Sequence, residues 1–480
     1  MKISRLQRFF ISLIPFTALF TYADIPAWRV GHNGIYENAS DSPVDWQKDL
    51  LFEIPLDDTS NGTPILVDGK LFYTAEPDQL ICADSRTGKT LWSRPNNLLE
   101  ISNLGPEKLQ SIAAHQERIN SQGKAQKRLK SDTKRLERAL EKKPDNAATK
   151  AALKKKQDEL AAMNKELKKL RSDKTFSIFV KPTTHNTNGY SSYSPVSDGK
   201  RVYVANGLGV VVAYDLKGDR LWSEFIEHPD HGWGGATMPQ LVDGKLIIRF
   251  DDYWALDPKT GKKLWNTPSE VIFGTPTPFQ VEGQTFLFTS RGEVLRASDG
   301  KRVHEGLVFL HESRHWSIFN TPTLVGETLY TVSGAEGDNG DAYAFRIPKD
   351  LITLLKKGLE LVWHTEVKKN RYYSSVLVLE GLAYIVTRDN ELTVLQAANG
   401  EIVYTEKISG VRGTAYPSMV AADNKIYLGV DDGTLVVLEP GREYKELARN
   451  KFGTFRSTPI FEDGVAYLRT YESLKAAGSL

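Results

Sequence analysis

The stretch TPILVDGKLFYTAEPDQLICADSRTGKTLW, residues 63–92, decides the fold, because close copies of it recur along the chain. The copies SPVSDGKRVYVANGLGVVVAYDLKGDRLW (194–222) and MPQLVDGKLIIRFDDYWALDPKTGKKLW (238–265) repeat its order of Pro, apolar residues, Asp-Gly, two apolar runs and Trp. Weaker copies begin near Thr277, Thr321, Ser375, Tyr416 and Thr458, which makes eight. Recurring units of this length, each too small to bury a core alone, are typical of propellers and solenoids.

The spacing of the copies indicates four-stranded propeller blades. From Pro195 onward, successive copies start 44, 39, 44, 54, 41 and 42 residues apart, which is the length of one blade. Asp-Gly or Glu-Gly pairs supply the tight hairpin between the first two strands of most copies. A Pro before the innermost strand is tolerated because that strand is a sheet edge. Seven copies carry it: Pro64, Pro195, Pro239, Pro278, Pro322, Pro417 and Pro459.

We therefore predict an all-β fold, an eight-bladed β-propeller of four-stranded antiparallel blades. The eighth copy ends soon after its third strand, whereas residues 44–53 (VDWQKDLLFE) precede the first copy. We expect this N-terminal strand, carrying Trp46, to complete the last blade and close the ring. A seven-bladed ring is the alternative, and it would leave that strand or one copy unplaced.

The segments ADSRTGKTLW (83–92), AYDLKGDRLW (213–222) and ALDPKTGKKLW (255–265) resemble the tryptophan-docking repeats of the pyrrolo-quinoline-quinone (PQQ) β-propeller superfamily. The resemblance implies that Trp92, Trp222 and Trp265 stack on the adjacent blade, with Tyr404 as a substitute in a later copy. It covers residues 28–104 and 173–480. It specifies the fold more closely than the function, because the superfamily includes both dehydrogenases and non-catalytic scaffolds.

Residues 105–172 interrupt the repeats and contain no Trp, Tyr or Phe. Leu153, Leu160 and Leu167 lie seven apart, as in a coiled-coil seam, and KPDN (143–146) reads as a turn between two helices. We predict an inserted antiparallel helical hairpin, a coiled coil, whose first helix is interrupted near Gly123. Its second helix, near 26 residues, would be about 39 Å long. The expected divisions are 24–104 for the closing strand and blade 1, 105–172 for the hairpin and 173–480 for blades 2–8.

The hairpin is strongly basic. Residues 107–174 contain 20 Lys and Arg against 10 Asp and Glu, a net charge of +10, so the rest of the chain carries −8. The segment is either simply a solvated helix pair or an arm that meets an anionic partner. We expect the partner to be an envelope protein or an anionic glycan or lipid surface. Nucleic acid is not expected, because the arm has no aromatic residue for base stacking.

The first residues read as an export signal. Lys2, Arg5 and Arg8 precede an apolar run of about 12 residues, too short to span a bilayer, and the sequence Thr21-Tyr22-Ala23 suits signal peptidase. We expect a signal peptide at 1–23, cleaved near Ala23, and a periplasmic or secreted protein. Residue 24 is Asp, so no lipid-anchored N-terminus is expected. Cys82 is the only cysteine, which excludes an internal disulfide.

The loops that lead into the innermost strands are rich in His, Arg and aromatic residues. Such side chains around a channel mouth can bind a planar anion or a sugar by charge-assisted hydrogen bonds and stacking. The alternative is that these loops are merely polar and bond to neighbouring blades. The candidate ligand-binding residues are His185, Tyr190, His228, His231, Trp233, His311, Arg314, His315, Trp316, Arg371, Tyr372, Arg412 and Arg456. No metal site and no catalytic residue is predicted.

Two function classes fit these observations. The first is an exported non-catalytic propeller that acts as a binding or assembly scaffold in the periplasm or cell envelope. In its repeats and predicted export the chain resembles the propeller subunit of the outer-membrane β-barrel assembly machinery. The second is a PQQ- and calcium-dependent quinoprotein dehydrogenase that oxidises alcohols or sugars. Those dehydrogenases carry an adjacent-cysteine disulfide that a chain with one Cys cannot form, and the acidic pairs Asp251-Asp252 and Asp431-Asp432 are expected in turns. We therefore predict no cofactor.

Overall fold

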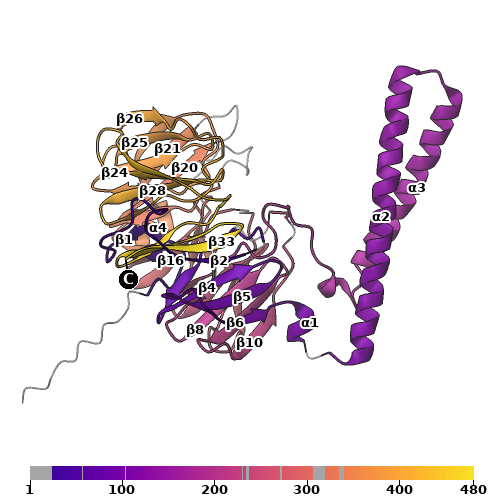
Figure 1. Cartoon of the computed structure of the whole chain (residues 1–480), viewed down its shortest axis with the longest axis horizontal. Coiled ribbons are helices and arrows are strands. Elements are labelled where there is room, and N and C mark those ends of the chain that lie inside the picture. The colour runs from indigo at the N-terminus through magenta and orange to yellow at the C-terminus, as the bar shows by residue number, and fades with distance from the viewer. Residues whose placement is uncertain are drawn as a thin grey trace, which may run out of the picture.

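The computed structural model describes residues 24–56, 58–102, 104–229, 231–233, 237–270, 273–305, 319–334 and 340–479. In that part of the chain the strands form eight sheets, and every sheet has an antiparallel four-stranded core. The predicted eight-bladed propeller is confirmed (Figure 1). The predicted signal peptide, residues 1–23, lies outside the described residues.

Blades 1 to 4 each take four consecutive strands. Blade 1 contains β3 (Ile65–Val67), β4 (Lys70–Ala75), β5 (Gln79–Asp84) and β6 (Thr90–Pro95). Blade 2 contains β7 (Val196–Ser197), β8 (Arg201–Asn206), β9 (Val210–Asp215) and β10 (Arg220–Phe225). Blade 3 contains β11 (Gln240–Val242), β12 (Lys245–Arg249), β13 (Tyr253–Leu256) and β14 (Lys263–Thr267). Blade 4 contains β15 (Thr277–Val281), β16 (Gln284–Phe288), β17 (Val294–Arg296) and β18 (Arg302–His304).

Blades 5 to 8 continue the ring, with the short helix α4 (Leu351–Lys357) before the last strand of blade 5. Blade 5 contains β19 (Thr323–Val325), β20 (Thr328–Gly334), β21 (Gly340–Arg346) and β22 (Glu360–Val367). Blade 6 contains β23 (Leu377–Leu379), β24 (Leu382–Val386), β25 (Glu391–Gln396) and β26 (Ile402–Lys407). Blade 7 contains β27 (Val420–Ala422), β28 (Lys425–Val430), β29 (Thr434–Leu438) and β30 (Glu446–Lys451). Blade 8 contains β31 (Ile460–Glu462), β32 (Val465–Arg469), β33 (Ser473–Gly478) and β2 (Leu50–Pro55).

The core is divided among the interfaces between blades. Phe72 and Leu80 of blade 1, for example, pack in one buried cluster with Val204 and Val212 of blade 2. Similar clusters join blades 2 and 3, 3 and 4, 4 and 5, 5 and 6, and 6 and 7, and one large cluster joins blades 7, 8 and 1. No blade has a core of its own, so each blade is stable only between two neighbours.

Tryptophans on the outermost strands tie successive blades together. The indole Nε1 of Trp92 donates to Leu216 O at 3.3 Å, and that of Trp222 donates to Pro258 O at 3.0 Å. Trp265 donates in the same way to Ala297 O at 3.1 Å. Trp363, which the sequence reading passed over, donates to Ala397 O at 2.8 Å. Each ring also lies against a turn glycine of the next blade, where a Cβ would come within 3 Å of the indole.

We predict that Trp222→Phe lowers the free energy of unfolding by about 1 kcal/mol, because the carbonyl of Pro258 loses its donor. Trp254→Phe is the matched control. Its indole Nε1 has no partner among the described residues, so that change removes no hydrogen bond. Urea unfolding of the two variants compares them directly. Equal losses for both would mean that packing alone holds these rings.

The N-terminal segment closes the ring. Strand β2 pairs antiparallel with β33, with Glu53 opposite Lys475, so the two ends of the chain share blade 8. The strand begins at Leu50, and Trp46 is not part of it, contrary to the expectation. Trp46 is instead fully buried between blades 7 and 8, where it contacts Phe452 and Phe461 edge to face.

A short helix, α1 (Leu98–Ile101), follows blade 1, and the insertion consists of two long helices, α2 (Pro106–Lys142) and α3 (Ala147–Arg171). Figure 1 shows α2 and α3 side by side, projecting from the propeller. Contacts between His115 and Leu170 near the base, and between Gln126 and Asn164 farther along, show that they run antiparallel. The predicted interruption near Gly123 is wrong, because α2 is continuous. Near this point the side-chain amide of Gln126 donates a hydrogen bond to Asn164 of α3, and one Gly costs a helix only about 1 kcal/mol.

Candidate functional site

A ring of hydrogen bonds encircles the propeller axis. In seven of the eight blades, within the described residues, the residue two positions before the innermost strand donates its backbone N–H to the side chain of its counterpart in the next blade. We call this set the hydroxyl ring: Thr63, Ser194, Met238, Thr275, Thr321, Ser375, Ser418 and Thr458. Seven such links join them in the described residues, at 2.9 to 3.2 Å. In blade 4 the ring residue is Thr275, so Pro276 takes the place that the sequence analysis gave to Pro278. In blade 7 the ring residue is Ser418, so Met419 takes the place given to Pro417.

The N-terminal segment 24–36 lies across the axis and touches most of the blades. Ile25 forms a β-bridge with Leu66 of blade 1, and Pro26 O accepts the N–H of Ser197 in blade 2. At its far end β1 (Ile35–Tyr36) pairs in parallel with β27 of blade 7. We call residues 24–36 the plug, because they occupy the channel between these blades.

Arg29 anchors the plug from inside. Its guanidinium is buried and donates to Val376 O at 3.0 Å and to Thr323 Oγ1 at 3.4 Å, which links blades 5 and 6. Burial lowers the pKa of Arg29 to about 10, so it stays charged at neutral pH. Burial, and then the charge of Arg29, lower the pKa of His32 to about 4, so that imidazole is neutral beside it. The plug thus carries one buried charge held mainly by carbonyl and hydroxyl oxygens.

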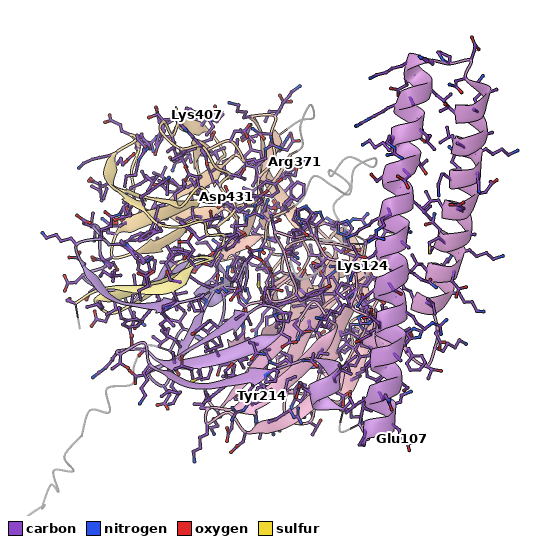
Figure 2. All side chains as sticks on the ribbon, turned by 45° about the vertical axis from the view of Figure 1, so that its right-hand side comes forward. Glu107, Lys124, Tyr214, Arg371, Lys407 and Asp431 are labelled. Carbon is purple, nitrogen blue, oxygen red and sulfur yellow. The ribbon has the colours of Figure 1, made fainter. Side chains whose placement is uncertain are left out.

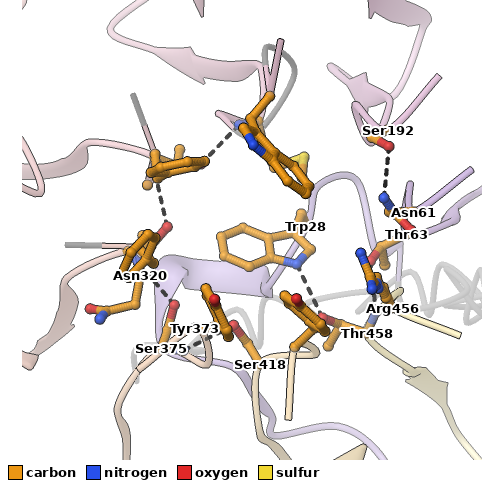
Figure 3. A pocket seen from close by; sticks show the side chains of 18 of the residues that line it. Trp28, Asn61, Thr63, Ser192, Asn320, Tyr373, Ser375, Ser418, Arg456 and Thr458 are labelled. Carbon is orange, nitrogen blue, oxygen red and sulfur yellow. Dashed lines mark hydrogen bonds between the residues drawn. The ribbon is translucent and has the colours of Figure 1, made fainter. Parts of the chain in front are cut away.

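A cavity of about 490 Å³ opens above the plug at the channel mouth. Trp28 of the plug lies at its centre, and its Nε1 donates to Thr458 Oγ1 of the hydroxyl ring at 3.3 Å (Figure 3). The walls are aromatic, from Trp233, Phe273, Phe319, Tyr373 and Tyr416. Three asparagines also line it: Asn61, Asn188 and Asn320. A volume of this size suits one small organic ligand.

Two guanidinium groups face this cavity. Arg456 lies over the ring of Tyr416, 3.9 Å from its centroid, and pairs with Asp431 at 3.0 Å. Arg371 lies 5.8 Å from the centroid of Phe319 and reaches the hydroxyl of Tyr373 at 3.4 Å. Within the described residues Arg371 has no ion-pair partner, so the cavity keeps one uncompensated positive charge.

The structure brings only part of the predicted set to the cavity. His231, Trp233, Arg371 and Arg456 line it, and His185 stacks on Trp233 with ring centroids 3.7 Å apart. Burial, followed by the charge of Arg249, lowers the pKa of His231, which favours a neutral ring. His311, Arg314, His315 and Trp316 lie outside the described residues.

The other predicted residues point elsewhere. Tyr372 is buried between blades 5 and 6 and donates to Lys368 O, because its side chain faces opposite to that of Tyr373. Tyr190 donates to Pro182 O, and Arg412 is exposed outside the cavity lining. His228 contacts Ser177 O at the base of the helical insertion.

The sequence reading missed the plug and its Trp28, together with the hydroxyl ring. The hydroxyl ring could have been predicted, since a Ser or Thr stands two residues before the innermost strand in most copies of the repeat. The sequence marks Trp28 less clearly, only as a tryptophan that lies outside every repeat.

The residues present do not fit PQQ with calcium. Calcium takes about six to eight oxygen ligands, usually with carboxylates among them. No carboxylate lines the described part of the cavity, and no group of three or more His, Cys, Asp or Glu gathers in the described ranges. The acidic pairs lie in bends or turns, with Asp431 committed to Arg456. Cys82 is buried within blade 1.

Comparison with known proteins shows the family of this chain. It matches the family described as "Outer membrane protein assembly factor BamB" over residues 209–347 and 333–474, more than half of its length. The chain belongs to the BamB family. The resemblance to PQQ-like propellers, and among them to the assembly subunit, is confirmed.

Two BamB relatives, from Moranella endobia and Yersinia pestis, are each 23% identical to the chain. The alignments cover 56% and 52% of this chain, and 69% and 64% of those relatives. The crystal structure of BamB from Moraxella catarrhalis matches with a TM-score of 0.47 and 14% identity, over 60% of this chain and 86% of that one. None of the helices in the described ranges is long and apolar enough to cross a bilayer.

Proposed function

We propose that this protein is an exported, non-catalytic scaffold that binds or assembles proteins of the cell envelope. Membership of the BamB family supports this, because the matched relatives are named as outer membrane protein assembly factors. The signal-like residues 1–23, with cleavage near Ala23, support a periplasmic location. The mature chain would then consist of the propeller, residues 24–104 and 173–480, and the helical arm, residues 105–172.

The arm is the observation that carries the proposal. Its helices α2 and α3, 37 and 25 residues long, project from the propeller, and Figure 2 shows Lys124 well up α2 from Glu107 at the base. Its net charge of +10 contrasts with −8 for the rest of the chain. Many of its cations are exposed: Lys124, Lys127, Arg128, Lys130, Lys134, Arg135, Arg138, Lys142, Lys150, Lys154, Lys155, Lys165, Lys168, Lys169 and Arg171. Such a surface fits an acidic face of an envelope protein.

The base of the arm is held firmly, as a docking element requires. His115 contacts Leu170 O at 2.9 Å and stacks on Phe176 with centroids 4.4 Å apart. Gln116 donates to the carbonyl of Phe179 in the 3-10 turn η2 (Ser177–Phe179). His228 of the propeller reaches Ser177 O, which ties η2 to the loop after blade 2. The chain then enters the loop that supplies Asn188 to the cavity, so the arm and the channel mouth share one segment.

We predict that the fourfold change Lys127→Gln, Lys130→Gln, Lys134→Gln and Lys142→Gln weakens capture of the envelope partner at least tenfold at low salt. Gln and Lys have similar helix propensities, so α2 is expected to persist. The measurement is photo-crosslinking and affinity capture from the envelope fraction, with circular dichroism of each variant.

The matched control carries Gln at four exposed propeller lysines: Lys200, Lys217, Lys259 and Lys262. It is expected to capture the partner normally. Equal capture by all variants would contradict a role for the arm charge. Binding of the native protein to vesicles with anionic lipid, in place of a protein, would assign the arm to a lipid surface instead.

A further inference from the structure

The cavity at the channel mouth presents donors and one net positive charge at its floor and walls. Each ring hydroxyl oxygen accepts an N–H, as Thr275, Thr321 and Ser375 accept from Met238, Thr275 and Thr321 at 2.9 to 3.0 Å. No acceptor among the described residues takes the O–H protons of these three hydroxyls, which are at least 97% buried. The floor is therefore a set of O–H donors.

The side chains around the cavity carry a net charge of one positive charge, that of Arg371. Asp431 balances Arg456, whereas Arg371 has no carboxylate in the described structure, and the lining there includes no Asp or Glu. A half-buried guanidinium beside aromatic rings favours a single anionic group that accepts its N–H bonds. The ligand should therefore bear one carboxylate, because a dianion would exceed the available charge.

The rest of the lining selects among carboxylic acids. The indole faces of Trp28 and Trp233 and the rings of Phe273 and Tyr373 offer flat apolar surface inside the cavity. The hydroxyls of the ring offer O–H donors close beneath. A purely aromatic acid would cover these polar groups without pairing them, which costs free energy. A pyranose has an apolar C–H face for the rings and several oxygens for the donors.

We propose that this cavity binds an acidic sugar, a uronic-acid unit whose carboxylate pairs with Arg371. The sugar ring lies against Trp28 and Trp233 above the hydroxyl ring. This inference does not rest on the scaffold function, and no residue of 105–172 lines the cavity. The plug is part of the site, because it supplies Trp28 at the centre of the cavity.

The test is a titration of the whole mature protein with cellobiouronate, the disaccharide of glucuronic acid and glucose, which carries one carboxylate; binding is followed by isothermal calorimetry and saturation-transfer NMR. The neutral disaccharide cellobiose and the aromatic acid 2-naphthoate are titrated in parallel. We expect cellobiouronate to bind at least tenfold more tightly than either, since cellobiose lacks the carboxylate and 2-naphthoate lacks the sugar oxygens. Tighter binding of 2-naphthoate, or no binding of cellobiouronate at millimolar concentration, would overturn the proposal.

Two substitutions locate the site. Arg371→Gln should weaken cellobiouronate binding tenfold or more while the affinity for cellobiose stays unchanged. Arg94→Gln is the matched control, because Arg94 also lies over an indole, 5.5 Å from the centroid of Trp92, but far from the cavity lining. Equal affinities of native protein and the Arg371 variant, with unchanged thermal unfolding, would place the sugar elsewhere.

Discussion

Replacing Asp58 by Ala should lower the free energy of unfolding by about 3 to 5 kcal/mol, because it leaves a buried guanidinium without its counter-charge. That guanidinium belongs to Arg469 on β32, whose side chain is completely inaccessible, and it pairs with Asp58, which is 9% exposed. Burial lowers the pKa of Arg469 and the charge of Asp58 raises it again, so the ion pair keeps the arginine protonated.

The position of this ion pair explains the size of the effect. Asp58 and Ser60 lie on the link from β2 of blade 8 to β3 of blade 1. Arg469 also donates to Ser60 O at 2.5 Å and to Thr470 O at 3.1 Å. The pair therefore holds the seam where the two ends of the chain meet.

Urea unfolding measures the loss as a lower midpoint with an unchanged m-value. Glu439→Ala is the control, because the Glu439–Lys445 pair is 45% and 63% exposed and should contribute less than about 1 kcal/mol. The double variant Asp58→Ala with Arg469→Leu should recover part of the loss, since no charge is then buried alone. An Asp58→Ala loss as small as that of Glu439→Ala would show that water solvates Arg469.

The fold could be predicted from sequence because each blade is specified locally. Asp68-Gly69 and Asp243-Gly244 both adopt positive φ in the hairpin turns, and the docking tryptophans stand at fixed distances beyond them. Such signals need no knowledge of distant contacts. The number of blades followed from counting the copies, and the need to close the ring pointed to a strand before the first copy.

The cavity was harder to predict because its parts come from far apart in the sequence. Loop composition found Arg371 and Arg456, but it also selected Tyr372, whose neighbour Tyr373 is the residue that faces the cavity. A loop without regular alternation gives no means of choosing between adjacent side chains. Trp28 is placed by the course of the plug across the axis, and no periodicity marks that segment.

The second large effect on stability is expected in the N-terminal segment that closes the ring. We predict that Trp46→Ala lowers the free energy of unfolding by about 3 to 5 kcal/mol, as expected for a large aromatic residue removed from a packed core. Trp46 is 0% exposed, and its ring centroid lies 5.7 Å from that of Phe452 and 6.2 Å from that of Phe461. The backbone there is fixed too, since Asn450 accepts the N–H of Trp46 and donates to Val44 O, both at 2.9 Å.

Two further substitutions test whether packing is the cause. Trp46→Phe should cost much less than Trp46→Ala, because the indole Nε1 has no hydrogen-bond partner in the described structure to lose. Leu447→Ala, on β30 of blade 7 but 38% exposed, should change stability by about 0.5 kcal/mol or less. Chemical denaturation of all three, followed by far-UV circular dichroism, gives the comparison. If Trp46→Phe proved as costly as Trp46→Ala, a polar interaction of the indole, and not its volume, would be what joins blades 7 and 8.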